Sequence, residues 1–314
     1  MNTTFLDGIL GNDHRSISRL ISDIEAGVPV SPELVADLHA HSFEAVRIGI
    51  TGPPGAGKST LVDQLIGTLR EAGNSVGVVA VDPTSPFTGG ALLGDRVRMN
   101  RFAWDDNVFI RSMGSQGDLG GLARKTQDVG DILAASGKDY VIYETVGVGQ
   151  GEHDVARAVD LTVVVLVPES GDEIQLMKAG LIEIADFFVI NKSDRSGAGR
   201  LASVLRNLLH SFGDPDKLEP PVINTVAARG EGIMQLKKGI LSHLDEMKKR
   251  GLFEKKRLER YRNRVRTIVH DRLLDAFWTS EKIKNLELLT ASLDSVKTSP
   301  YTLADGLLKN ETVI

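Results

Sequence analysis

Hydrophobic residues change their spacing along the chain, and the changes separate three zones. In the first zone, residues 1–44, they recur at helical spacing, at Ile17, Leu20, Ile21, Ile24, Leu34 and Leu38. The run AGVPVSPE interrupts this spacing with two prolines and a glycine. The pattern predicts two short amphipathic helices.

In the second zone, residues 45–248, short apolar runs alternate with helical stretches. The runs are VRIGIT, VGVVAVD, NVFIRS, YVIYET, LTVVVLVP, FFVIN and PPVINT. Continuous β-branched runs are typical of parallel strands that are buried on both faces, and the helical stretches supply the crossovers between them. The fold class predicted is therefore α/β, a doubly wound and mostly parallel sheet flanked by helices.

The third zone, residues 249–314, begins with a long helical pattern. Apolar residues form one stripe at Leu258, Tyr261, Val265 and Ile268, and most other positions of this stretch are basic. We expect the stripe to pack on the body of the protein or on a second subunit. The basic face is either solvated or a docking surface for a partner or an acidic ligand. The run SPYTLADGLL predicts a final helix.

The composition narrows the class of protein. The 314 residues include 41% hydrophobic and 25% charged residues and no cysteine, with a formal net charge of −5. The absence of cysteine excludes disulfides and thiolate metal sites, and the acidic balance argues against a general affinity for nucleic acid. No apolar run approaches the roughly eighteen residues of a membrane span, and the acidic start of the chain does not fit a targeting peptide. We therefore expect a cytoplasmic protein that binds neither nucleic acid nor membranes.

A phosphate-binding loop follows the first apolar run. The stretch GITGPPGAGKST has the P-loop spacing Gly-x-x-x-x-Gly-Lys-Ser and precedes an amphipathic helical pattern. In such a loop the backbone N–H groups surround the β-phosphate, the lysine neutralises phosphate charge and the serine hydroxyl can bind Mg²⁺. The residues expected to contact the nucleotide here are Gly52, Pro53, Pro54, Gly55, Ala56, Gly57, Lys58, Ser59 and Thr60.

A second motif indicates which base is bound. Asn191, Lys192 and Asp194 belong to the string Asn-Lys-Ser-Asp, which ends an apolar run and therefore lies at the sheet edge where ligands bind. A carboxylate at Asp194 can accept hydrogen bonds from the ring N–H and the amine of guanine, whereas adenine has no such pair of donors. We also expect a backbone N–H near Ala227 to contact the guanine carbonyl. The two motifs together predict a site for GTP and GDP.

The string Glu-Thr-Val-Gly, residues 144–147, ends another apolar run near the expected γ-phosphate. Glu144 is placed to reach metal-bound water or the attacking water, and the N–H of Gly147 can contact the γ-phosphate. Asp82 ends a further run and is equally well placed to hold the water shell of Mg²⁺. The metal site expected here is made by Ser59, Asp82 and Glu144.

Longer stretches carry a family resemblance. They are VDPTSPFTGGALLGDRVRM, YETVGVGQGEHDVARAVD and PESGDEIQLMKAGLIEIAD, together with the P-loop and the Asn-Lys-Ser-Asp string. Over nearly its whole length the chain resembles the MeaB/ArgK family, P-loop GTPases that act as chaperones of adenosylcobalamin-dependent acyl-CoA mutases. The resemblance implies a client of the methylmalonyl-CoA mutase type, whose cofactor loading the protein would gate and which it would protect or reactivate. It also implies a homodimer, with residues 249–314 as a helical dimerisation arm.

The resemblance implies roles for individual residues as well. Asp82, Asp95 and Glu144 would form the acidic set around metal and water, and residues 83–99 and 145–155 would be two switch segments. In a third switch, Asp172, Gln175 and Lys178 would become ordered near the nucleotide when the mutase binds. The catalytic residues expected on this basis are Lys58, Asp82, Asp95, Arg98, Glu144 and Lys178. The alternative is that Arg98 and Lys178 are surface charges and that Asp95 caps a turn.

Three other functions remain as alternatives. A GTPase for metallocentre assembly of another client would need cysteine and histidine ligands, and the chain has no cysteine. A transport-linked P-loop ATPase or kinase would lack the guanine motif. A GTP-dependent scaffold without turnover would share every motif described above.

Overall fold

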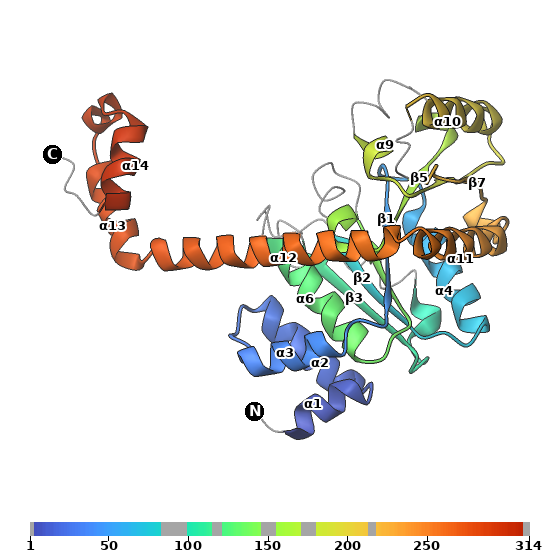
Figure 1. Ribbon diagram of the computed structural model, residues 1–314, viewed down its shortest axis with the longest axis horizontal. Coiled ribbons are helices and arrows are strands. Elements are labelled where there is room, and N and C mark those ends of the chain that lie inside the picture. Colours follow the sequence, from blue (N-terminus) through green and yellow to red (C-terminus); the bar gives the residue numbers. More distant parts are fainter. Residues whose placement is uncertain are drawn as a thin grey trace. The chain divides into compact units, whose positions relative to one another are not determined.

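The computed structural model describes residues 3–82, 99–114, 121–145, 155–170, 180–212 and 218–309. The chain divides into two units, Met1–Arg260 and Tyr261–Ile314. The first unit contains the sheet and the helices that cover it (Figure 1).

All seven apolar runs form strands of one parallel sheet with the order β3-β2-β4-β1-β5-β6-β7. The strands are β1 Val46–Thr51, β2 Val76–Asp82, β3 Val108–Gly114, β4 Tyr140–Glu144, β5 Leu161–Leu166, β6 Phe187–Ile190 and β7 Val222–Asn224. Strands β2, β3 and β4 lie on one side of β1, and β5, β6 and β7 lie on the other. The loop that follows β1 therefore lies at the point where the strand order changes direction, which is where doubly wound sheets bind ligands. The predicted fold class is confirmed.

Helices cover both faces of the sheet (Figure 1). Successive strand residues point to opposite faces, so Ile142 packs in one core while Val141 and Tyr143 pack in the other. The first core is formed with α4 Lys58–Glu71 and α11 Ile233–Lys249, and the second with α1 Thr3–Leu10, α2 His14–Glu25, α3 Pro32–Ala40 and α6 Gly121–Ala135. A third core joins α9 Leu181–Ile184 and α10 Ala198–Phe212 to β5 and β6.

The N-terminal segment forms three helices, so the prediction of two was wrong. The additional helix, α1, precedes a turn at Asn12, whose φ of 62° lies in the left-handed region. Asp13 then caps α2, because its carboxylate accepts a hydrogen bond from the N–H of Ser16 at 2.9 Å. The apolar pattern of α1 is only two turns long, too short to separate from the following helix by periodicity alone.

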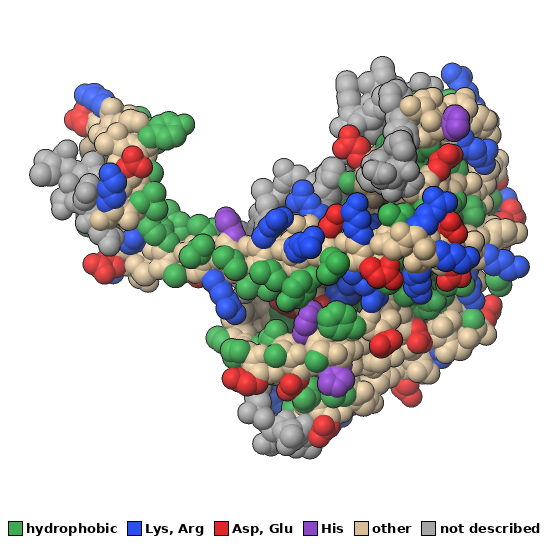
Figure 2. Space-filling model, in the orientation of Figure 1, with side chains coloured by type: hydrophobic (Ala, Val, Ile, Leu, Met, Phe, Trp, Pro, Cys, Tyr) green, Lys and Arg blue, Asp and Glu red, His purple; other side chains and the backbone are tan. Residues whose placement is uncertain are grey.

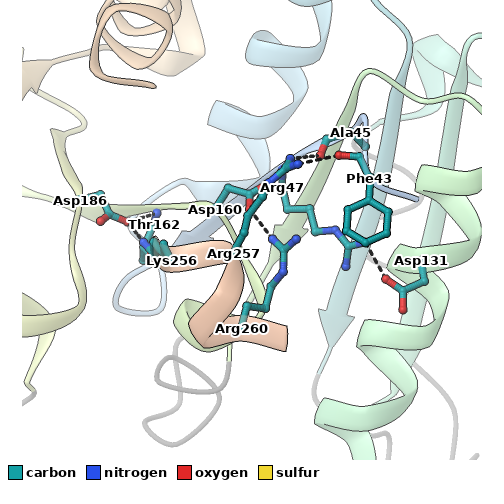
Figure 3. A network of polar contacts seen from close by, with 10 residues as sticks. All are labelled: Phe43, Ala45, Arg47, Asp131, Asp160, Thr162, Asp186, Lys256, Arg257 and Arg260. Carbon is teal, nitrogen blue, oxygen red and sulfur yellow. Dashed lines mark hydrogen bonds and ion pairs between the residues drawn. The ribbon is translucent and has the colours of Figure 1, made fainter. Parts of the chain in front are cut away.

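A buried ionic network, shown in Figure 3, fastens the start of α12 (Leu252–Phe277) to the sheet. Its centre is Asp160, which precedes β5 and is 0% exposed. The Asp160 carboxylate accepts hydrogen bonds from the backbone N–H of Arg47 at 2.9 Å and from Arg257 Nε and Nη2 at 3.2 Å each, and it pairs with Arg260. Arg257 also donates to the backbone carbonyls of Phe43 and Ala45. The network lies at the amino ends of β1 and β5, at the edge opposite the P-loop.

The second unit continues α12 and adds α13 Ser280–Leu289, a 3₁₀ helix Leu293–Lys297 and α14 Pro300–Lys309. The predicted final helix is confirmed in α14. Green side chains follow α12 in Figure 2, and large apolar residues of this unit are exposed at Tyr261, Val265, Val269, Leu273, Leu288, Leu293, Val296, Tyr301 and Leu308. Among the residues that the structure describes, no helix has the length and apolar character needed to cross a membrane.

His243 makes part of the stability of the first unit dependent on pH. His243 lies on α11, and its ring centroid is 6.2 Å from that of Phe187. Burial lowers the pKa of its imidazole below the ordinary 6.5. The unfolded chain therefore takes up a proton at a higher pH than the folded chain does. The free energy of unfolding is therefore unaffected by the titration of His243 above pH 6.5. It decreases as the pH falls from 6.5 through the lowered pKa of the folded chain. We expect the urea midpoint to fall more between pH 7.5 and pH 5.5 in the wild type than in His243→Gln, and equal falls would contradict this.

Candidate functional site

The P-loop connects β1 to α4 at the carboxyl edge of the sheet, and its backbone requires glycine. Gly52 and Gly57 have φ values of 138° and 86°. A Cβ atom at Gly52 would lie 2.1 Å from the carbonyl oxygen of Val165, and one at Gly57 would lie 2.5 Å from Nδ2 of Asn191. Neither position can accept a side chain unless the neighbouring strand or loop moves.

Lys58 starts α4 and is held against this loop. Its Nζ donates hydrogen bonds to the carbonyl oxygens of Gly52 at 2.8 Å and Pro53 at 3.0 Å, and only 6% of the residue is exposed. These bonds fix the position of the ammonium group at the N-terminus of a fourteen-residue helix. A fixed cation at a helix N-terminus is suited to bind the phosphates of a nucleotide.

Ser59 and Glu144 meet beside Lys58. The Ser59 hydroxyl donates a hydrogen bond of 2.6 Å to Oε1 of Glu144, and both residues are buried. Glu144 ends β4, where it is in register with Ile50 of β1 and Ala80 of β2. A hydroxyl and a carboxylate are hard oxygen ligands of the kind that Mg²⁺ prefers, so the pair fits this ion. Asp82 ends the adjacent strand β2, but its side chain is not among the described parts of the structure.

Asn191 joins the base-recognition motif to two other loops. Its Nδ2 donates a hydrogen bond to the carbonyl of Ala56 in the P-loop at 2.8 Å. Its Oδ1 accepts from Thr225 Oγ1 at 3.1 Å and from the N–H of Ala227 at 3.0 Å. Lys192, with a φ of 55°, adds a bond from Nζ to the carbonyl of Gly55 at 2.8 Å. The structure therefore brings the predicted phosphate loop and the predicted base loop into direct contact.

Asp194 and Ala227 differ in how accessible their polar groups are to a ligand. The side chain of Asp194 is 40% exposed, so its carboxylate can accept hydrogen bonds from a base. The N–H of Ala227 is engaged by Asn191, and the residue is 1% exposed. The guanine contact near Ala227 stays a prediction.

One pair of buried threonines next to the P-loop has no signal in the sequence pattern. Thr145 follows Glu144 and donates a hydrogen bond from its hydroxyl to Oγ1 of Thr51 at 2.9 Å, and both residues are buried. The pair joins the carboxyl ends of β4 and β1. Six other predicted site residues lie outside the described parts of the chain: Asp95, Arg98, Gly147, Asp172, Gln175 and Lys178.

Comparison with known proteins places the chain among GTPases. Residues 17–282 match the family model of methylmalonyl-CoA mutase-associated GTPase MeaB. A GTPase of Pyrococcus abyssi is 43% identical over 300 residues, which cover 95% of this chain and 93% of that protein. GTPase ArgK of Escherichia coli is 34% identical over 80% of this chain and 77% of its own length. The mouse mitochondrial methylmalonic aciduria type A homolog is 37% identical over 84% of this chain and 65% of its own.

A solved structure agrees with the fold. The crystal structure of a LAO/AO transport system kinase has a TM-score of 0.71 to this chain, with 22% identity, and covers 99% of this chain and 98% of its own. At that identity the likeness concerns the fold alone. The matches in sequence, together with the contact between the P-loop and the Asn-Lys-Ser-Asp loop, show that the chain is a GTPase of the MeaB family.

Proposed function

We propose that this GTPase is a chaperone of an adenosylcobalamin-dependent acyl-CoA mutase of the methylmalonyl-CoA mutase type. It would gate loading of the mutase cofactor and protect or reactivate the mutase. The observation that carries the proposal is the match of residues 17–282 to a family described as mutase-associated. The name of the mouse relative, which refers to methylmalonic aciduria, supports the same client.

The reaction proposed is hydrolysis of GTP to GDP and phosphate, in which water attacks the γ-phosphorus and the bond to the β,γ-bridging oxygen breaks. Lys58, fixed by two carbonyls, would neutralise charge on the β- and γ-phosphates. Ser59 and Glu144 would hold Mg²⁺, which when bound supplies further neutralisation of phosphate charge. Glu144, at the end of β4, would also orient water near the γ-phosphate.

The base would be selected by Asp194. Its exposed carboxylate can accept from the two N–H groups that guanine presents, and an adenine base would leave that carboxylate without donors. Asn191 would hold the base-recognition loop in place, because its amide connects the P-loop with the 225–227 loop.

We also propose a cytoplasmic homodimer in which residues 249–314 form the dimerisation arm, residues 45–248 the GTPase domain and residues 1–44 a helical segment. The exposed apolar side chains of the second unit support this part of the proposal. Burial of such side chains against a second copy would remove apolar surface from water.

Mutase-dependent GTP turnover tests the proposed function. Steady-state hydrolysis of GTP should rise about tenfold or more when a purified adenosylcobalamin-dependent methylmalonyl-CoA mutase is added, because partners that order catalytic groups accelerate GTPases strongly. ATP in place of GTP should give no stimulation. Lys58→Ala with the mutase should show turnover lowered about 100-fold or more, which excludes a GTPase that contaminates the mutase. Unchanged turnover of a protein that hydrolyses GTP would contradict the proposed client.

A further inference from the structure

Arg229 faces the carboxylate that is proposed to recognise guanine. Its Nη1 lies 3.6 Å from Oδ2 of Asp194, and its Nε lies 2.7 Å from Oε1 of Glu231. We propose that Arg229 is a positioning residue for guanine recognition, which holds the Asp194 carboxylate where it accepts the N–H groups of the base. The inference rests on the proposed guanine site.

The turn that carries Arg229 is closed by its own hydrogen bonds. Val226 and Glu231 form an antiparallel bridge, with N–O distances of 3.0 and 3.3 Å. A 3₁₀ helix, Ala227–Arg229, lies inside the bridge, and Gly230 leaves it with a φ of 72°. The bridge holds the backbone of Glu231 close to Arg229, and the Glu231 carboxylate pairs with the Arg229 guanidinium.

The same turn contacts both ends of the base-recognition motif. At one end, the N–H of Ala227 donates a hydrogen bond to Oδ1 of Asn191. At the other end, Arg229 pairs with Asp194. The turn thus contacts both Asn191, which connects the loops, and Asp194, which is proposed to contact the base.

The geometry of the pair leaves the carboxylate able to bind guanine. A separation of 3.6 Å is too long for a hydrogen bond, so the acceptor positions of Asp194 are not consumed by Arg229. The positive charge of Arg229 at that distance still attracts the Asp194 carboxylate and restricts where it lies. A carboxylate that is already positioned loses less conformational freedom when the base binds.

Affinity for a guanine nucleotide measures this effect. In calorimetric titrations at 50 mM salt, Arg229→Gln should bind GDP about two- to fivefold more weakly than the wild type, the range for an exposed ion pair. The difference should shrink at 500 mM salt because the pair is screened. Arg250→Gln is the matched control, since Arg250 is 57% exposed against 54% for Arg229 and pairs with Glu246 on α11. It should bind GDP like the wild type.

The same Arg229→Gln change, made in an Asp194→Asn protein, separates positioning of Asp194 from a general structural role of Arg229. Asp194→Asn replaces the carboxylate by an amide, whose N–H can donate to the carbonyl that xanthine carries in place of the guanine amine. In Asp194→Asn, titrated with xanthosine diphosphate, the added Arg229→Gln change should alter the affinity by less than about 1.5-fold. A loss as large as that seen with GDP would overturn the inference, because Arg229 would then act on the turn itself.

The outcomes distinguish this inference from the proposed guanine site. A wild-type protein that binds ADP as tightly as GDP would overturn the guanine site and the inference with it. Selective binding of GDP by the wild type, with no change in Arg229→Gln, would overturn the inference alone.

Discussion

Replacement of Lys58 by alanine is expected to lower kcat/KM for GTP about 100-fold or more. Lys58 is the buried cation of the P-loop, fixed by bonds to the carbonyls of Gly52 and Pro53. Removal of a single preorganised group that stabilises transition-state charge typically costs about 10²- to 10³-fold in rate. The measurement is release of phosphate over a range of GTP concentrations.

Lys237→Ala is the matched control for this experiment. The Nζ of Lys237 also donates to a backbone carbonyl, that of Thr68 at 2.7 Å, but near the end of α4 that lies away from the P-loop. It should retain turnover within about twofold. Circular dichroism should show that both variants are folded. A folded Lys58→Ala protein with wild-type turnover would contradict the assignment of the phosphate site.

The fold and the two nucleotide loops could be predicted because their signals are local. Each strand was visible as a continuous apolar run, and all seven runs lie in the sheet. The P-loop and the Asn-Lys-Ser-Asp string are short motifs whose chemistry needs fixed spacing. Their position at the carboxyl edge followed from the parallel topology. The contact between Asn191 and Ala56 confirms that the topology brings these two motifs together.

Contacts between distant parts of the chain could not be predicted in the same way. Arg229 lies in a loop for which the sequence predicts only a backbone contact to the base. Its ion pair with Asp194 depends on the fold of the 226–231 turn. Thr51 ends an apolar run, so its hydrogen bond to Thr145 had no signal in the pattern. Such pairs depend on strand order and turn geometry. The spacing of residues along one segment gives no information about either.

The basic residues at the start of α12 illustrate the same limit. Their sequence pattern indicates either a solvated face or a docking surface, yet Lys256, Arg257 and Arg260 pair with aspartates of the body. The partners Asp160 and Arg257 are 97 positions apart. Only the folded chain shows that these charges serve to fasten the helix.

Asp160→Asn is expected to lower the free energy of unfolding by about 3–5 kcal/mol, the cost of removing one partner of a buried ion pair. Asp160 is fully buried, and its carboxylate accepts from Arg257 and the backbone of Arg47 and pairs with Arg260. Asparagine keeps the shape of the side chain but leaves two partly buried guanidinium groups, those of Arg257 and Arg260, without their anion. Urea unfolding followed by circular dichroism measures the change. Asp294→Asn removes the anion of an exposed pair with Lys297 and should change stability by less than about 0.5 kcal/mol. If Asp160→Asn stays within that range, the network does not stabilise the start of α12.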